Sequence, residues 1–159
     1  MSKPIKLNLT VQFPDKRLQK QFPRALLTST VQAALFAPAQ ITLRFVDALE
    51  GLTLNRDYRG KDYATNVLTF AYTEDIDAET TEADIILCTD VLQQEAIDQH
   101  KTLKDHTLHL IVHGVLHAQG YDHEDEEEAT EMEGLEIDIL AQLGIANPYH
   151  VTTDSNQPT

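Results

Sequence analysis

Three histidines with a regular spacing are the residues of this sequence best suited to chemistry. His113 and His117 are four residues apart, which places both imidazoles on one face of a helix. Gly120 can adopt a positive φ, so it can end that helix and turn the chain toward His123. Three imidazole nitrogens can hold one cation and leave its fourth tetrahedral position open to water, as in catalytic zinc sites. The spacing therefore predicts one zinc ion per chain, bound by His113, His117 and His123.

The residue after the first histidine does not fit a peptidase. The spacing H-x3-H-x2-G-x2-H is that of the metzincin peptidases, which carry a general-base glutamate directly after the first histidine. Gly114 occupies that position here. A zinc peptidase is thus an alternative that the spacing favours and Gly114 disfavours. A structural metal is a second alternative, although structural zinc has four protein ligands and no good fourth ligand is evident nearby.

Other titratable residues around the motif have simpler interpretations. His109 and His106 lie one turn and two turns before His113 on the same helix face. Three ligands already satisfy a catalytic zinc, so we assign His109 to packing or to a contact with a metal-binding imidazole. Asp122 and Glu124 flank the third histidine and are interpreted as solvated surface charge.

A short basic segment is the second place that could do chemistry. Arg56, Arg59 and Lys61 lie within six residues together with Tyr58. Guanidinium and ammonium groups bind phosphate oxygens, and a tyrosine ring can stack on an unpaired base, so this segment suits single-stranded RNA. A solvated turn of the same composition is the simpler alternative. The residues alone leave this choice open.

Length, composition and charge limit the remaining possibilities. The 159 residues, 42% hydrophobic and 24% charged, suffice for one soluble domain with a sizeable core. No apolar segment predicts a signal peptide or a membrane span, and the single cysteine, Cys88, is typical of a reducing compartment, so we expect the cytoplasm. The net charge of −14 is concentrated in residues 105–159, which hold 12 acids and no Lys or Arg. Any RNA contact is therefore expected within residues 1–104.

Hydrophobic periodicity predicts an α+β fold. Strand patterns occur at residues 5–13, 41–46, 67–72 and 84–89. Helical patterns occur at about 15–36, 90–101, 105–119 and 125–143, with a short helical turn at 47–60. Pro23 would disturb the interior of the first helix, which favours a start about one turn later. We expect a small mixed sheet of about four strands packed with about five helices, and the histidines at the end of a central helix. Residues 1–145 form the predicted single domain, and residues 146–159 a disordered tail.

Two stretches of the chain together resemble the YbeY endoribonucleases, a family of metal-dependent hydrolases. One stretch is the histidine motif from His113 to His123, followed by an acidic run and Glu131-Met132-Glu133. The other is Leu54-Asn55-Arg56-Asp57-Tyr58-Arg59-Gly60-Lys61-Asp62, which leads to Thr65-Asn66-Val67-Leu68-Thr69-Phe70. The resemblance covers roughly residues 40–144.

Three positions depart from the usual pattern of the family. Asn66, Thr69 and Ala83 stand where the family usually has aspartate, serine and glycine. The change at residue 66 removes a carboxylate, which puts in doubt any role of that group in activating water or orienting Arg59.

The resemblance implies a function and a set of roles. It implies a single-strand-specific, metal-dependent endoribonuclease that acts in ribosomal RNA maturation, notably at the 3′ end of the small-subunit RNA, and in ribosome quality control. It implies zinc, a catalytic role for Arg59, and possible RNA contacts at Arg56, Tyr58 and Lys61. The implied partners are ribosomal RNA and the small ribosomal subunit, without a membrane, and the oligomeric state is left open. A non-catalytic ribosome-assembly factor with a structural metal is the alternative.

The expected mechanism joins the two segments. Zinc would lower the pKa of a bound water toward 7 or polarise a phosphoryl oxygen, and Arg59 would stabilise the negative charge of the transition state. A phosphodiester carries its own charge, so metal and arginine could do much of this work without a glutamate base. Water and the 2′-hydroxyl of the substrate both remain possible nucleophiles. This mechanism requires Arg59 to lie near the three histidines.

Overall fold

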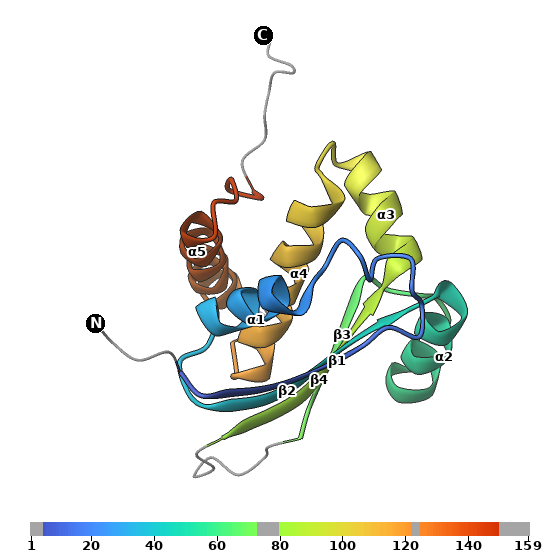
Figure 1. Cartoon of the computed structure of the whole chain (residues 1–159), viewed down its shortest axis with the longest axis horizontal. Coiled ribbons are helices and arrows are strands. Elements are labelled where there is room, and N and C mark those ends of the chain that lie inside the picture. The colour runs from blue at the N-terminus through green and yellow to red at the C-terminus, as the bar shows by residue number, and fades with distance from the viewer. Residues whose placement is uncertain (1–4, 73–79, 122–124, 150–159) are drawn as a thin grey trace, which may run out of the picture.

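The sheet has four strands in the spatial order β1-β2-β4-β3. The structure is a computed structural model that describes residues 5–72, 80–121 and 125–149. Its strands are β1 (Leu7–Gln12), β2 (Ala39–Val46), β3 (Val67–Ala71) and β4 (Thr81–Cys88). β1, β2 and β4 are parallel, and β3 pairs antiparallel with β4 at one edge of the sheet (Figure 1).

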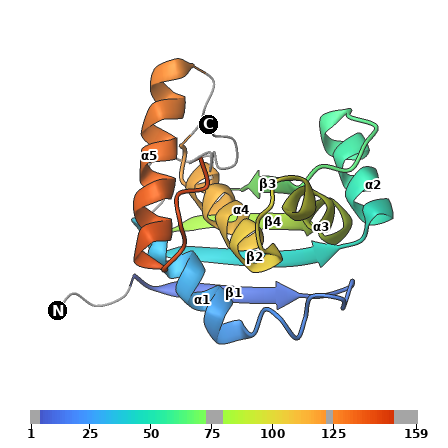
Figure 2. The same cartoon turned by 90° about the horizontal axis from the view of Figure 1, so that it is seen from above.

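The described residues form five helices, and one of them is central. The helices are α1 (Arg24–Ala33), α2 (Ala48–Arg59), α3 (Thr89–Asp98), α4 (Leu103–Ala118) and α5 (Glu126–Gln142). α4 lies across β3 and β4 and contacts α1, α3 and α5; Figure 2 shows it between α5 and α3. The predicted α+β fold is confirmed. No helix in the described ranges is long and apolar enough to span a membrane.

The two faces of the sheet carry separate apolar clusters. Side chains alternate along a strand, so neighbouring residues of β4 point to opposite faces. Ile85 belongs to the larger cluster, which also contains Ile111 and Val115 of α4. Ile86 belongs to the smaller cluster, against which Leu54 of α2 packs. α2 and α4 therefore cover opposite faces of the sheet.

The first predicted helix is too long at its start. Helical spacing predicted residues 15–36, but α1 begins only after Pro23, which is its N-cap. Proline has no backbone N–H and would break the interior of a helix, so it fits the helix start. The residues before it form turns, and the amide of Asp15 donates to the carbonyl of Phe45, 3.2 Å away.

The packed part of the chain continues past the predicted domain end at residue 145. Gly144 has a φ of 80° and ends α5, and the amide of Ile145 then donates to the carbonyl of Leu140 at 2.8 Å. Ile145 is buried, and Lys101 Nζ donates to the carbonyl of Pro148 at 3.0 Å. Contacts to the folded part of the chain thus continue at least to Pro148, while the domain bounds stay a prediction. Residues 150–159, the rest of the predicted tail, lie outside the described residues.

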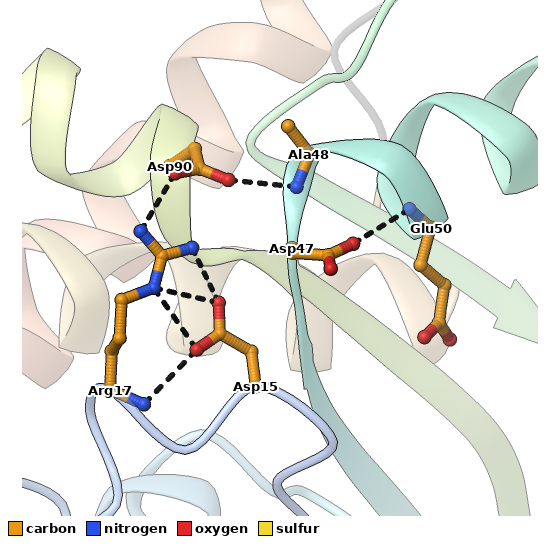
Figure 3. Close-up of polar contacts among 6 residues, drawn as sticks. All are labelled: Asp15, Arg17, Asp47, Ala48, Glu50 and Asp90. Carbon is orange, nitrogen blue, oxygen red and sulfur yellow. Dashed lines mark hydrogen bonds and ion pairs between the residues drawn. The ribbon is translucent and has the colours of Figure 1, made fainter.

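A polar junction joins three elements at the carboxyl ends of the parallel strands (Figure 3). Arg17, in the segment after β1, donates to Asp15 Oδ2 at 2.6 Å and to Asp90 Oδ1 at 2.8 Å. The other carboxylate oxygen of Asp90 accepts from the amide of Ala48, the first residue of α2, at 2.8 Å. The hydrogen bonds from Arg17 hold the pKa of both carboxyls below their usual range.

Candidate functional site

α4 brings two of the three predicted metal ligands together. The helix begins at Thr102, whose side chain accepts from the amide of Asp105 at 3.1 Å. The imidazole centroids of His113 and His117 are 4.6 Å apart. Both residues are partly exposed, whereas the residues between them are buried. The i, i+4 spacing thus places two partly exposed imidazoles in contact on one face of α4.

The third predicted ligand lies outside the described residues. Gly120 has a φ of 101°, as expected of the residue that ends this helix and redirects the chain. His123 follows at a position that the structure does not describe. No group of three His, Cys, Asp or Glu able to hold a metal occurs among residues 5–72, 80–121 and 125–149. The three-histidine zinc site therefore stays a prediction.

A buried carboxylate on α5 contacts the first of these histidines. Glu136 Oε2 lies 2.8 Å from His113 Nδ1, and Glu136 Oε1 lies 2.6 Å from His109 Nε2. The hydroxyl of Tyr149 donates to the same Oε1 at 2.6 Å. Glu136 is fully buried, so these contacts replace water around its carboxylate.

The charge of Glu136 decides which nitrogens carry hydrogen. Burial raises the pKa of Glu136, but the hydrogen bonds from His109, His113 and Tyr149 outweigh it and lower the pKa to about 2. An ionised carboxylate only accepts hydrogen bonds, so the hydrogen of His113 sits on Nδ1. In neutral His113 the unprotonated nitrogen is then Nε2, the form a metal ligand requires. This donor chemistry fits a zinc ion.

His109 uses its Nε2 for the carboxylate rather than for a metal. Its other ring nitrogen, Nδ1, is buried without a hydrogen-bond partner in the described part of the chain. The ring is in edge contact with Tyr149, with centroids 5.5 Å apart. The structure therefore places His109 in the contact with Glu136. Burial and Glu136 both raise the pKa of Tyr149, so its hydroxyl keeps its proton.

Close packing explains why Gly114 stands where a peptidase has its base. A Cβ atom at Gly114 would lie 3.0 Å from Ile85 Cγ2 and 3.2 Å from Thr69 Oγ1. Any side chain here would have to enter the interface between α4 and the sheet. A glutamate at this position would require Ile85, which is fully buried, to shift. The peptidase alternative thus lacks both the base and the space for it.

The basic segment begins in the last turn of α2, which contains Arg56 and Arg59. Asp47 caps the helix by accepting from the amide of Glu50 at 2.9 Å, and Gly60 ends it with a φ of 71°. Asn55, which is buried, donates to the carbonyl of Tyr63 at 2.7 Å and so fixes the following turn. The predicted catalytic residue, Arg59, is the last residue of this helix and is exposed.

In the described part of the chain, Arg59 makes no hydrogen bond or ion pair with His113 or His117. Its side chain makes no hydrogen bond or ion pair within residues 5–72, 80–121 and 125–149. α2 lies on the sheet face opposite α4, and edge strand β3 runs between them. Phe70 of β3 is in ring contact with Tyr58 at 5.4 Å, and the adjacent Thr69 approaches Gly114. Arg59 and the histidines of α4 thus lie on helices that cover opposite faces of the sheet, and the proximity that the mechanism requires stays a prediction.

An aromatic groove continues from the basic segment along the face of the sheet that α2 covers. It has a volume of about 650 Å³, and its lining includes Tyr58, Phe70 and Tyr72. Tyr58 and Tyr72 are 70% and 59% exposed, so their rings are accessible. Arg44, Glu50 and Asp84 also line the groove. Arg44 donates to Glu50 at 2.7 Å, and the hydroxyl of Tyr72 donates to Asp84 at 2.7 Å. The exposed rings are the groups here that could stack on a base.

Asn66, one of the three residues that depart from the family pattern, forms hydrogen bonds with Glu95 and Val67 and not with Arg59. Its Nδ2 donates to Glu95 Oε1 at 3.0 Å, and its Oδ1 accepts from the amide of Val67 at 2.6 Å. Glu95 also contacts His106 Nε2 at 2.9 Å, and burial lowers the pKa of His106. An aspartate at this position would place two carboxylates together. Asn66 here joins the start of β3 to α3 and α4.

Sequence reasoning missed Glu136 and Tyr149. A signal for Glu136 exists, because it occupies the buried stripe of α5 together with Met132, Ile139 and Leu140. A carboxylate at such a position must have partners, so it marks a polar contact inside the core. Tyr149 gave no such signal, since it lies in a polar stretch beyond the last helix.

Comparisons with known proteins agree on one family. The family model described as endoribonuclease YbeY matches residues 6–144. Proteins named endoribonuclease YbeY from Janthinobacterium sp. (strain Marseille) and Herminiimonas arsenicoxydans are 73% and 65% identical over 144 and 149 residues. The alignments cover 91% of this chain in both cases, and 95% and 96% of those proteins.

One solved structure has a similar fold. It is the solution structure of TM1509 from Thermotoga maritima, with a TM-score of 0.53 and 20% sequence identity. The alignment covers 94% of this chain and 99% of that one. At this identity the likeness concerns the fold alone.

Proposed function

We propose that this chain, which belongs to the YbeY family of endoribonucleases, is a zinc-dependent enzyme that cleaves single-stranded RNA during ribosomal RNA processing. The observation that carries the proposal is the paired imidazoles of His113 and His117 on α4, in a chain that the family matches over residues 6–144. We place the activity in the cytoplasm, on the small ribosomal subunit, at the 3′ end of its RNA and in ribosome quality control.

His113, His117 and His123 would hold the zinc ion. A bound zinc supplies a Lewis acid and a water whose pKa is near 7. The hydrogen bond at His113 Nδ1 keeps that ring in the tautomer whose Nε2 can bind metal. Gly114 lets α4 pack closely against the sheet. The two histidines lie on this packed helix and not on a loop.

The basic segment would bind the RNA strand on the other side of β3. Arg59 is exposed at the end of α2, where its guanidinium can bind phosphate oxygens in a forked pair of hydrogen bonds. Tyr58 would stack on an unpaired base, and Arg56 and Lys61 would contact neighbouring phosphates. A strand that reaches both Arg59 and the histidines must bend around edge strand β3. A flexible single strand can follow that path, whereas a duplex is too wide and stiff, which supports the preference for single-stranded RNA.

The test is cleavage of a single-stranded RNA oligomer, with zinc content measured on the same samples. Arg59→Glu is expected to retain zinc and to lose roughly 10²- to 10³-fold in cleavage rate, because a phosphate-binding donor is replaced by a repelling charge. Lys20→Glu is the matched control, since it reverses an exposed cation in the segment between β1 and α1. Undiminished cleavage by the Arg59→Glu variant would contradict the assigned role.

Metal analysis separates the enzyme from an assembly factor with a structural metal. We expect one zinc per chain in protein that has not met a chelator. His117→Ala is expected to fold normally and to be inactive, whereas loss of a structural zinc ligand would unfold the protein. Protein that holds no transition metal would remove the basis of the proposal. A casein digestion assay on the zinc-loaded protein is expected to show no proteolysis.

A further inference from the structure

The carboxylate of Glu136 accepts hydrogen bonds from three donors that belong to other elements. His109 and His113 come from α4, and Tyr149 comes from the segment after α5. An unpartnered carboxylate in the core would be strongly unfavourable, so each of these hydrogen bonds offsets part of the cost of burial. The sequence places no other acid in the buried stripe of α5.

We propose that Glu136 and Tyr149 are positioning residues for the metal centre, acting through His113. Glu136 holds the His113 ring in one orientation and one tautomer, and Tyr149 fixes the carboxylate that does so. This inference rests on the proposed zinc site at His113, and it adds two residues that contact neither substrate nor metal. A ligand imidazole bonded to a carboxylate through its second nitrogen is a stronger and better oriented metal ligand.

The division of the two carboxylate oxygens supports this role. Oε2 accepts from His113 Nδ1 at 2.8 Å. Oε1 accepts from His109 and Tyr149, both at 2.6 Å. Two donors on one oxygen fix the rotation of the carboxyl group, so the other oxygen must point at His113. The ring of His113 is thereby set by contacts from α5 and from the C-terminal segment as well as from its own helix.

Tyr149 is held in place independently of Glu136. Lys101 Nζ donates to the carbonyl of Pro148, directly before it, at 3.0 Å. Ile145, four residues earlier, is part of the main apolar cluster. The hydroxyl of Tyr149 therefore reaches Glu136 from a segment that is anchored at two other points. Such an anchored donor can hold the carboxylate in position while metal binds and leaves.

Glu136→Gln tests the proposal with little change of shape. A glutamine side chain has one acceptor oxygen and one donor amide, so it cannot accept from all three donors. Zinc affinity, measured by competition with a chelator, is expected to fall on the order of 10- to 100-fold. In metal-free protein, the ¹⁵N shifts of the His113 ring are expected to move from the Nδ1–H tautomer toward a mixture. Asp138→Asn is the matched control, because it removes an exposed charge from the same helix and should change neither quantity.

Tyr149→Phe keeps the test informative if the first variant is poorly folded. It removes only the hydroxyl and leaves the ring against His109. We expect a smaller loss of zinc affinity, of about threefold to tenfold, in the same direction. If both variants bind zinc as tightly as the wild type and His113 keeps its tautomer, the role is structural and the proposal is wrong. These measurements involve no RNA, so a failure of RNA cleavage and a failure of this inference are separate results.

Discussion

Gly114 shows how packing sets the chemistry available at a single position. Gly114 lies in sequence between two partly exposed histidines. Its own Cα, however, faces Thr69 and the buried Ile85 on the sheet. α4 can cross β3 and β4 at this distance only because no Cβ is present. The helix therefore holds the imidazoles of His113 and His117 on one side and contacts the sheet through Gly114 on the other.

Two glycine substitutions in helices isolate this contact. Gly134→Ala in α5 meets no atom within 4 Å, so the higher helix propensity of alanine should stabilise the protein by about 0.5–1 kcal/mol. Gly114→Ala has the same gain in propensity, but its Cβ presses on Ile85, and overpacking costs about 1–3 kcal/mol. We expect a net loss of about 1 kcal/mol, measured by urea unfolding. An equal gain at both positions would show that the interface has room.

Site residues whose contacts are close in sequence could be predicted, whereas those with contacts between distant segments could not. His113 and His117 follow from a spacing of four along one helix, and Gly120 follows from the need to end that helix. Glu136 is 23 residues away from His113 in sequence, and no local pattern joins them. Tyr149 lies beyond every predicted element. Contacts between distant segments depend on the packing of α5 against α4, which periodicity does not specify.

At the level of elements, Arg17 joins the segment after β1 to α3, and through Asp90 to α2. These three elements meet where parallel strands end, and parallel strands have no hairpins to tie them together. The side chains of Arg17 and Asp90 are 45% and 40% exposed, so solvent screening limits the stabilisation to about 1 kcal/mol. Asp15 is more enclosed, with its side chain 7% exposed.

The junction should make stability depend on acid pH. The pKa values of Asp15 and Asp90 are lower in the folded chain than the ordinary 3.8, so their contribution is fully present above that value and is lost as pH falls below it. Arg17→Gln is expected to lower the urea midpoint at pH 7 and to flatten its decline as pH falls below about 4. Arg56→Gln is the control, because its 3.5 Å pair with Asp57 is exposed on both sides. An unchanged acid decline in Arg17→Gln would contradict this account.

Element types were predictable here, and element boundaries less so. Sequence patterns identified the four strands of the described residues, with β4 predicted from a run of consecutive apolar residues. Helical spacing identified the helices, except that α2 is a helix of 12 residues where only a short helical turn was predicted. The start of α1 was misplaced because residues 15–22 carry apolar side chains that pack as turns, with Leu18 and Phe22 fully buried. The periodicity of buried residues in turns resembles that of a helix. Pro23 indicated the later start of α1, since a proline fits the start of a helix and not its interior.

At the scale of the whole molecule, the two faces of the sheet differ in charge as well as in the elements that cover them. The acidic residues of α5 lie on the side of α4, and the first turn of α5 alone contains Glu126, Glu127 and Glu128. Arg56, Arg59 and Lys61 lie at the end of α2, on the other face. A net charge of −14 opposes RNA binding over most of the surface. Few phosphates can therefore be contacted at once.

This limit is measurable as a weak salt dependence. Three cations that contact phosphates of a single strand give a slope of log K against log salt no steeper than about −2, at roughly −0.7 for each contact. Lys61→Ala is expected to reduce the slope by about 0.7, and Lys20→Ala to leave it unchanged. The measurement is RNA binding by fluorescence anisotropy between low and moderate salt. A slope far steeper than −2 would indicate an RNA surface elsewhere.

β3 lies between the basic segment and the histidines of α4. Its register along β4 decides which of its side chains face α4 and which face the groove. Thr69 pairs with Ile85 and Phe70 with Asp84, so Thr69 faces α4 and Phe70 faces the groove. A slip of one residue along β4 would exchange the faces of every side chain of the strand. Phe70 would then meet Gly114, and Thr69 would meet Tyr58. An error of one residue in strand pairing would thus change the side chains beside the histidine pair and beside the aromatic groove at the same time.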